Sequence, residues 1–169
     1  MKNTRFFCVL AFIIFFTVSA FGNNGNLRIT IDGSSFQEEV EAYMEYFGNY
    51  YSSTASNIDI ILYSGNIEIY FELFVPNGNN RLVSGTYNLS SSLNDDHGPF
   101  TFSFGEIYFD DDDYYEVTGG TLTVSSTGQG ANTVYTVVFD LDVEDDYGFS
   151  CTASGSYRGS FEWDDYSRD

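Results

Sequence analysis

Histidine, cysteine and proline are scarce in this 169-residue chain, which has one histidine, two cysteines and two prolines. His97 lies in the turn-rich segment 94–99, and a Ser-His-Asp arrangement would have to be built around it. No G-x-S-x-G nucleophile turn and no phosphate-cradling glycine loop occurs. Beyond the first 22 residues, His97 and Cys151 are the only soft metal ligands, too few for a zinc site. We therefore expect a protein that is not an enzyme.

The chain begins with a positive residue pair and an apolar run. Lys2 and Arg5 precede the run, which extends almost unbroken over residues 6–18 and is followed by small residues. This is the pattern of an export signal, and the run is short for a membrane span. We predict a secretory signal peptide over residues 1–22 and a single domain over residues 23–169. A retained N-terminal anchor is the alternative.

Removal of the signal peptide would leave no lysine in the chain. Four arginines would then oppose all 25 acidic residues, a formal charge of −21. Such a surface repels phosphate backbones and anionic lipid, so nucleic acid and an anionic membrane surface are disfavoured as partners, whereas a cationic partner suits it. Cys8 would leave with the signal peptide, and Cys151 would then have no partner for an internal disulfide. Stability must therefore come from packing.

Alternation of apolar and polar residues is the strongest structural signal. It runs through residues 67–75, 134–141 and 151–163, where β-branched and aromatic residues are frequent. A period of two indicates half-buried strands of an antiparallel sheet. We predict an all-β fold, either an antiparallel β-sandwich or a partly closed barrel, of about nine strands. These strands are expected near residues 27–32, 58–63, 67–75, 81–89, 100–109, 114–118, 120–126, 133–143 and 149–163.

The segment 35–48 fits two structures. Ser35-Phe36-Gln37-Glu38 has the form of a capping box, and Gly48 is placed to end a helix. Residues at helical spacing follow the box, but an overlapping set alternates as in a strand. We favour a short helix over residues 36–47. The helical set is Phe36, Val40, Tyr43, Met44 and Phe47, and the alternating set is Val40, Ala42, Met44 and Tyr46.

A weak internal duplication divides the domain into two related halves. Each half has the order strand, strand and S-G-x-Y strand. The glycine of the S-G-x-Y motif allows a bend or a close backbone approach, and the tyrosine can fill the space beside it. The first half comprises residues 58–60, 67–73 and 84–87, and the second comprises residues 122–124, 134–141 and 154–157.

The run from Tyr114 to Tyr157, with its Y-E-V-T-G-G-T-L-T-V, Y-T-V-V-F-D-L and S-G-S-Y segments, resembles exported proteins and lipoproteins of Bacteroides-type bacteria. Residues 46–51 and 84–87 resemble the same uncharacterised group. The resemblance implies a periplasmic, cell-surface or secreted location and carries over no functional residue. This chain differs from the lipoprotein members because it lacks a cysteine at the cleavage site.

Four adjacent aspartates, Asp110, Asp111, Asp112 and Asp113, form the candidate metal site. Carboxylates crowded in a hairpin loop repel one another unless they are solvated or bridged by a hard cation, and calcium suits such loops. The run does not match the spaced D-x-D-x-D-G calcium loop, because adjacent side chains on an extended segment diverge. The alternative is a solvated loop that guards strand ends against aggregation. We expect no other cofactor.

Tyrosine is abundant, with 14 copies, and four of them form the candidate ligand site. Tyr50, Tyr51, Tyr114 and Tyr115 fall at strand ends or loops, where flat rings can stack on a glycan or a protein. The alternative is a set of half-buried rim residues. The expected function is accordingly a secreted or envelope-associated binding module.

Two further functions stay open. One is a small outer-membrane barrel or ligand-holding barrel, which alternating strands allow. The other is a hydrolase that uses paired carboxylates, because Glu68 and Glu72, like Asp140 and Asp142, share one face of a strand. With 25 acidic residues such pairs arise by chance, so we expect these four to be solvent-facing charges.

Overall fold

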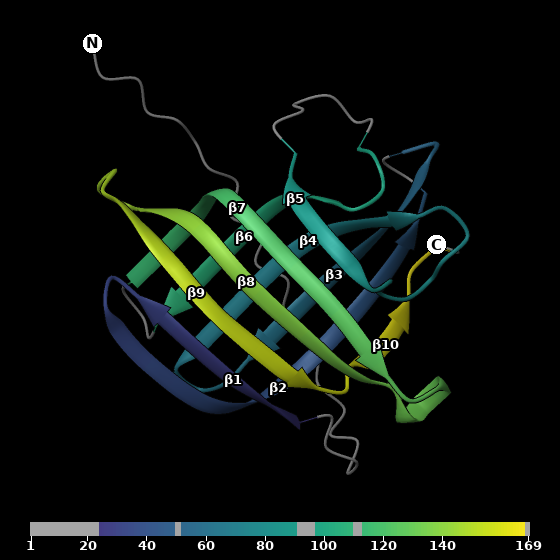
Figure 1. Ribbon diagram of the computed structural model, residues 1–169, viewed down its shortest axis with the longest axis horizontal. Helices are drawn as coiled ribbons and strands as arrows, with labels where there is room; N and C mark the ends of the chain where they lie inside the picture. Colours follow the sequence, from purple (N-terminus) through teal and green to yellow (C-terminus); the bar gives the residue numbers. More distant parts are fainter. Residues whose placement is uncertain (1–23, 50–51, 91–96, 110–112, 168–169) are drawn as a thin grey trace.

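Ten β-strands and one short 3-10 turn make up the part of the chain that the computed structural model describes, residues 24–49, 52–90, 97–109 and 113–167 (Figure 1). No α-helix occurs in these ranges, so the all-β prediction is confirmed. The strands are β1 (Asn24–Ile31), β2 (Ser34–Gly48), β3 (Ala55–Tyr63), β4 (Ile67–Pro76), β5 (Gly85–Leu89), β6 (Thr101–Phe109), β7 (Asp113–Thr127), β8 (Val134–Asp145), β9 (Ser150–Gly159) and β10 (Glu162–Asp165).

Nine of the strands form a ring of hydrogen bonds. The order is β1-β9-β8-β7-β5-β6-β4-β3-β2, and a further pairing of β1 with β2 closes it. Neighbours are antiparallel except β5 with β6, and β10 adds to β2 in parallel from outside the ring. The ring is not a regular barrel, because the short β5 is inserted where β6 and β7 also pair directly. Figure 1 shows β1, β9, β8 and β7 in front of β2, β3 and β4.

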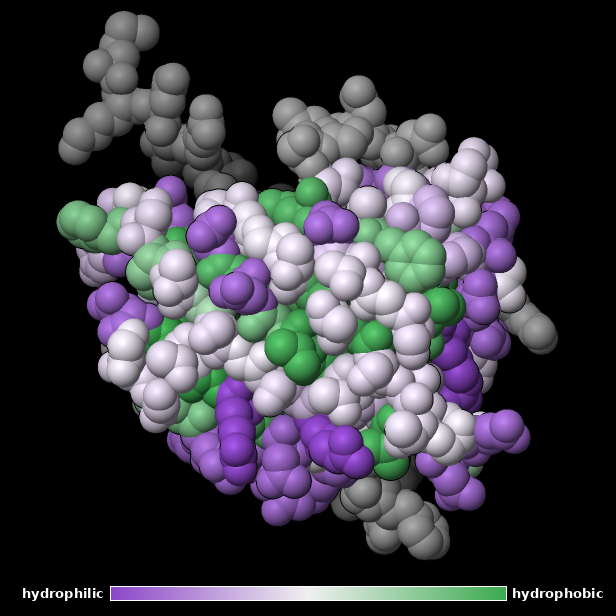
Figure 2. All heavy atoms as spheres, in the orientation of Figure 1, coloured by the Kyte–Doolittle hydropathy of each residue, from purple (hydrophilic) through white to green (hydrophobic). Residues whose placement is uncertain are grey.

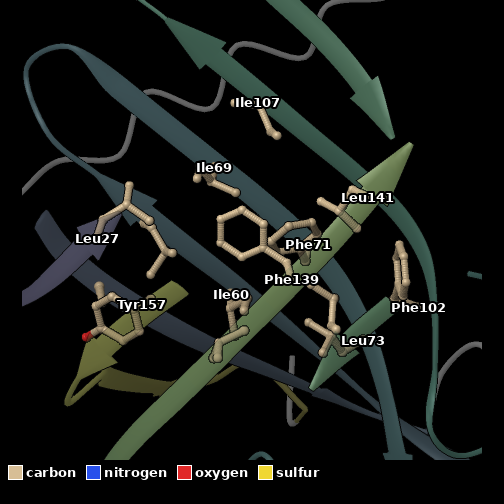
Figure 3. Packing of buried hydrophobic residues seen from close by; sticks show 14 of the residues in the cluster. Leu27, Ile60, Ile69, Phe71, Leu73, Phe102, Ile107, Phe139, Leu141 and Tyr157 are labelled. Atoms are coloured by element: carbon tan, nitrogen blue, oxygen red, sulfur yellow. The ribbon is translucent and has the colours of Figure 1, made fainter. Parts of the chain in front are cut away.

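Alternate side chains of the strands point into the ring and fill it. Figure 3 shows this interior, where the rings of Phe71 on β4 and Phe139 on β8 lie 6.2 Å apart between their centroids. Leu27, Ile60 and Tyr157 extend into the same interior from other strands, and all three are fully buried. Burial of so many apolar side chains is the main driving force for closing the sheet.

The helix expected over residues 36–47 is wrong, because this segment belongs to β2. Val40, Ala42 and Met44, the alternating set, are buried in the core. The strand pairs with β1 through its first half, with β3 through its second half, and with β10 on the remaining edge. Backbone pairing with β1 in the first half, and with β3 and β10 in the second half, therefore outweighs the local capping box, a case of tertiary context overriding local preference.

Other strand boundaries also differ from the sequence prediction. Within the expected strand 81–89, β5 begins only at Gly85. The expected strands 114–118 and 120–126 are one strand, β7, with an irregularity between Val117 and Gly119 in its pairing with β8. The expected strand 149–163 is two, since β9 ends at Gly159 and β10 begins at Glu162. A glycine explains the difference in β7. In the sequence Gly120 suggests a turn, but in the structure it lies within a bulged strand, with a φ of 104°.

The glycine of the S-G-x-Y motif packs in the same way in both halves, whereas the hydrogen bond of the tyrosine differs. A Cβ on Gly85 would lie 2.6 Å from the ring of Phe100, and a Cβ on Gly155 would lie 2.5 Å from the ring of Phe139. Each glycine therefore makes room for a phenylalanine ring. The Tyr87 hydroxyl donates to the Val83 carbonyl at 2.7 Å. The Tyr157 hydroxyl donates to the Ser160 carbonyl at 2.6 Å.

Strand pairing of the motif differs between the halves. In the second half β7, β8 and β9 are consecutive neighbours, whereas in the first half β5 leaves β4 and pairs with β7 and β6.

Residues 1–22, the expected signal peptide, lie outside the described residues. In the described ranges, no helix is long and apolar enough to cross a membrane.

Candidate functional site

The two outer faces of the ring have different chemistry. On β1, β7, β8 and β9 many outward side chains are serine and threonine, together with Arg28, Arg158 and the β8 carboxylates Asp140, Asp142 and Glu144. Figure 2 shows this side as largely white, the colour of residues near the middle of the hydropathy scale. The Arg158 guanidinium donates to the Thr136 hydroxyl at 3.4 Å.

The opposite outer face, built by β2, β3, β4, β6 and the start of β7, carries tyrosines and carboxylates. We call it the tyrosine–carboxylate face. It lies on the more distant side of the molecule in Figure 1. Its members are Glu41, Tyr43, Glu45, Asp59, Tyr63, Glu68, Tyr70, Glu72, Glu106, Tyr108, Tyr114 and Glu116.

Strand register sets three of these tyrosines in one line, which we call the tyrosine row. Tyr63 on β3 lies opposite Glu68 on β4, Glu68 opposite Tyr108 on β6, and Tyr108 opposite Tyr114 on β7. Because neighbouring strands are about 4.8 Å apart, the row extends roughly 14 Å across the strands. Tyr63 is 42 % exposed and Tyr108 is 38 % exposed, so their rings face solvent.

Glu106 holds two tyrosines of the row. Its carboxylate accepts the Tyr108 hydroxyl at 3.0 Å and the Tyr114 hydroxyl at 2.9 Å, and the two rings lie 5.0 Å apart. Burial, and then the hydrogen bond to Glu106, raise the pKa of both phenols above the ordinary value, so both stay protonated donors. Burial and the nearby Glu106 also raise the pKa of the Glu68 carboxyl. Glu106 thus holds the side chains of Tyr108 and Tyr114 in place before any ligand arrives.

The hairpin between β8 and β9 presents two exposed aromatic rings beside the row. Tyr147 is 86 % exposed and Phe149 is 72 % exposed. The Asp145 carboxylate accepts the backbone N–H groups of both residues at 2.9 Å, which orders the turn. Asp145 pairs with Tyr115, the neighbour of Tyr114, so the hairpin tip adjoins the end of the row.

The structure separates the four tyrosines expected to bind a ligand. Tyr114 is part of the tyrosine row, whereas Tyr115 points to the other side of β7 and packs against the core, with its ring 6.3 Å from that of Phe109. The two differ because successive side chains of a strand point to opposite faces. Tyr50 and Tyr51 lie outside the described residues.

The expected metal site falls largely outside the described part of the chain. Asp110, Asp111 and Asp112 are not among the described residues, and Asp113 is an exposed residue at the start of β7, opposite Phe109. Among the described histidine, cysteine, aspartate and glutamate side chains, no group of three or more is placed to hold a metal ion.

The carboxylate pairs on β4 and β8 take different places. Glu68 and Glu72 both lie on the tyrosine–carboxylate face, with Tyr70 between them, and the Ser103 hydroxyl donates to Glu72. Asp140 and Asp142 are exposed on the serine- and threonine-rich face.

The scarce reactive residues are both engaged in packing. His97 is only 9 % exposed, and its ring stacks on Phe74 with centroids 4.4 Å apart. Burial raises the pKa of the half-buried Cys151 thiol, with nearby Asp32 and Asp145 acting in the same direction. A thiol kept protonated in this way is a poor nucleophile.

Sequence reasoning missed the residues that form the row. Tyr63 and Tyr108 lie far apart in the chain, and only the pairing of β3, β4 and β6 brings them into line. The exposure of Tyr147 and Phe149 could have been predicted from the sequence. Both flank Gly148 in an acidic turn, where apolar side chains cannot reach the core.

No protein-family model, no curated protein and no solved structure matches the chain.

Proposed function

We propose that this protein is an exported binding domain that takes a glycan chain on the tyrosine row. The observation that carries the proposal is the alignment of Tyr63, Tyr108 and Tyr114 across neighbouring strands, with Glu68 and Glu106 between and beside them. A rigid sheet holds this line of rings, so a ligand would not have to order it.

The chemistry of the row suits a sugar surface. Tyrosine rings provide flat apolar area for the carbon faces of sugar rings, and the interleaved carboxylates accept hydrogen bonds from sugar hydroxyls. Tyr147 and Phe149 on the adjoining hairpin extend the aromatic surface by two rings that are mostly exposed. A chain of several sugars would therefore be contacted along the row and at its end.

The charge of this face narrows the class of glycan. The face carries no arginine among its members, and its carboxylates disfavour uronate or sulfate groups. We propose a neutral or amino-sugar chain.

The apolar side chains that fill the ring leave the outer surface as the place for a ligand. The proposed export rests on the apolar run at residues 6–18 and on the resemblance to exported proteins of Bacteroides-type bacteria.

Substitution of the row tests the proposal. The mature protein would be screened on a glycan array and by affinity electrophoresis in soluble polysaccharides, followed by the variants Tyr63→Ala and Tyr108→Ala. Loss of one stacked ring, about 1 kcal/mol, should weaken binding about 5- to 10-fold. Tyr166→Ala is the matched control, because Tyr166 is 43 % exposed and lies off the row. Equal binding by all three variants, or no binding to any glycan, would contradict the proposal.

The competing function is a hydrolase that uses Glu68 and Glu72, and the same samples separate it from binding. A binding domain leaves the polysaccharide intact. Release of reducing ends that is abolished by Glu68→Gln or Glu72→Gln, with binding retained, would replace binding with hydrolysis as the function of this face.

A further inference from the structure

One carboxyl group of the tyrosine–carboxylate face is buried. Asp59 on β3 is 8 % exposed, and it accepts the Tyr70 hydroxyl at 2.5 Å and the Asn57 side-chain amide at 3.2 Å. The amide group of Asn57 also reaches the Leu73 carbonyl, and Asn57 is itself 1 % exposed. The carboxyl group is therefore held by fixed partners and has little contact with water.

The groups around Asp59 are acidic on both sides. Glu45 on β2 and Glu72 on β4 lie directly opposite it in the register, and Asp164 on β10 lies opposite Glu45. On β6, Glu106 lies opposite Tyr70. Farther along β4, the ring of His97 stacks on Phe74, which lies opposite Asn57.

The three arginines that the structure describes lie elsewhere. Arg28 and Arg158 belong to the serine- and threonine-rich face, and Arg81 lies over the ring of Trp163 at 5.1 Å from its centroid. Burial is the main cause that raises the pKa of Asp59 to about 7, and Glu72 and Glu45 add to it, whereas the hydrogen bonds from Tyr70 and Asn57 act the other way.

We propose that Asp59 is a proton-operated switch that sets the direction of its hydrogen bond with Tyr70. In the carboxylate form Asp59 accepts the phenol O–H. When a proton from water adds to the carboxylate, the new O–H donates to the phenol oxygen, and the hydroxyl hydrogen of the partly exposed Tyr70 turns to water. The change relieves the repulsion along the row of Asp164, Glu45, Asp59 and Glu72. The switch does not depend on the glycan proposal, because it needs no ligand.

Direct titration of the carboxyl group by NMR tests the switch in the mature protein without ligand. The Asp59 side-chain carbon should titrate near neutral pH, and the Tyr70 ring resonances should shift with the same midpoint. Two variants should move this midpoint in opposite directions. Tyr70→Phe removes a hydrogen bond that favours the carboxylate and should raise it, whereas Glu72→Gln removes a like charge and should lower it.

Urea unfolding gives a second readout, which begins with the unsubstituted protein. Because the folded protein holds the Asp59 proton more tightly than the unfolded chain, this group's contribution to stability is complete at low pH and is lost as pH rises through about 7. The urea midpoint should therefore be lower at pH 8 than at pH 6, and Asp59→Asn should reduce that difference. Asp142→Asn, an exposed aspartate on the opposite face, is the control. An Asp59 midpoint below pH 5, or a shift of the same sign in both variants, would overturn the switch.

Discussion

Gly155 shows, at the scale of single residues, how a missing side chain shapes the core. An added Cβ would overlap the Arg28 carbonyl oxygen and the ring of Phe139, which packs directly against the glycine. Neither neighbour is free to move, since one is strand backbone and the other is a fully buried ring. The S-G-x-Y motif is therefore a packing motif, and its glycine is required by close approach.

Substitution of this glycine should destabilise the fold. We expect Gly155→Ala to lower the free energy of unfolding by about 1–3 kcal/mol, because overpacking forces the β1 backbone or Phe139 to shift. Gly65→Ala is the matched control, since a Cβ at Gly65 would meet nothing within 4 Å. Thermal melting followed by circular dichroism would measure both. An unchanged melting temperature for Gly155→Ala would show that the close contact is not a real constraint.

At the scale of elements, side-chain contacts hold β10 in place, because its backbone pairing is short. It has four residues and pairs in parallel with Tyr43–Tyr46 of β2. The indole N–H of Trp163 donates to the Asn80 carbonyl at 2.9 Å, and Arg81 lies over the indole ring. These contacts tie the end of the chain to the loop between β4 and β5.

Removal of the indole should release β10 selectively. We expect Trp163→Ala to cost about 2 kcal/mol and to accelerate amide exchange in residues 162–165, while β3 and β4 keep their protection. Arg81→Ala should cost less than about 1 kcal/mol, because it removes only the cation–π contact. Hydrogen exchange monitored by mass spectrometry would separate these effects. Uniform loss of protection over the whole sheet would contradict a local role.

Comparison of β4 and β2 shows what the sequence could and could not predict at this scale. The alternation of Ile67, Ile69 and Phe71 has one interpretation, and β4 was correctly predicted. Residues 36–47 carry helical and strand periodicities together, and the decision depends on β1, β3 and β10, which supply partners on both edges. Local sequence holds no information about those partners.

At the scale of the whole molecule, charge is the dominant property. The chain has 25 acidic against six basic residues. The tyrosine–carboxylate face collects many of the acidic residues, and Arg28 and Arg158 lie on the other face. The sequence predicted the acidity, but it could not predict this segregation, since only strand register assigns Glu45, Asp59 and Glu72 to one line.

Salt should stabilise such a molecule. Raising sodium chloride from about 10 to 300 mM shortens the Debye length several-fold and should raise the melting temperature by about 2–4 °C, equivalent to ~1 kcal/mol. Calcium chloride at equal ionic strength separates screening from binding. A larger rise with calcium that is lost in Asp111→Asn would support the expected site at Asp110–Asp113, and equal rises would dismiss it.

Closure of the ring has a consequence for how copies of the molecule meet. Among the described strands, β10 alone has a single neighbour, and the first half of β2 pairs with β1 only, so most of the strand backbone is already paired. The edge of β10 carries Glu162, Asp164 and Asp165, and two such edges brought together would set like charges opposite each other. Concentrated solutions should therefore resist growth of cross-β fibrils at neutral pH, and this protection should fade in acid as the carboxylates become neutral.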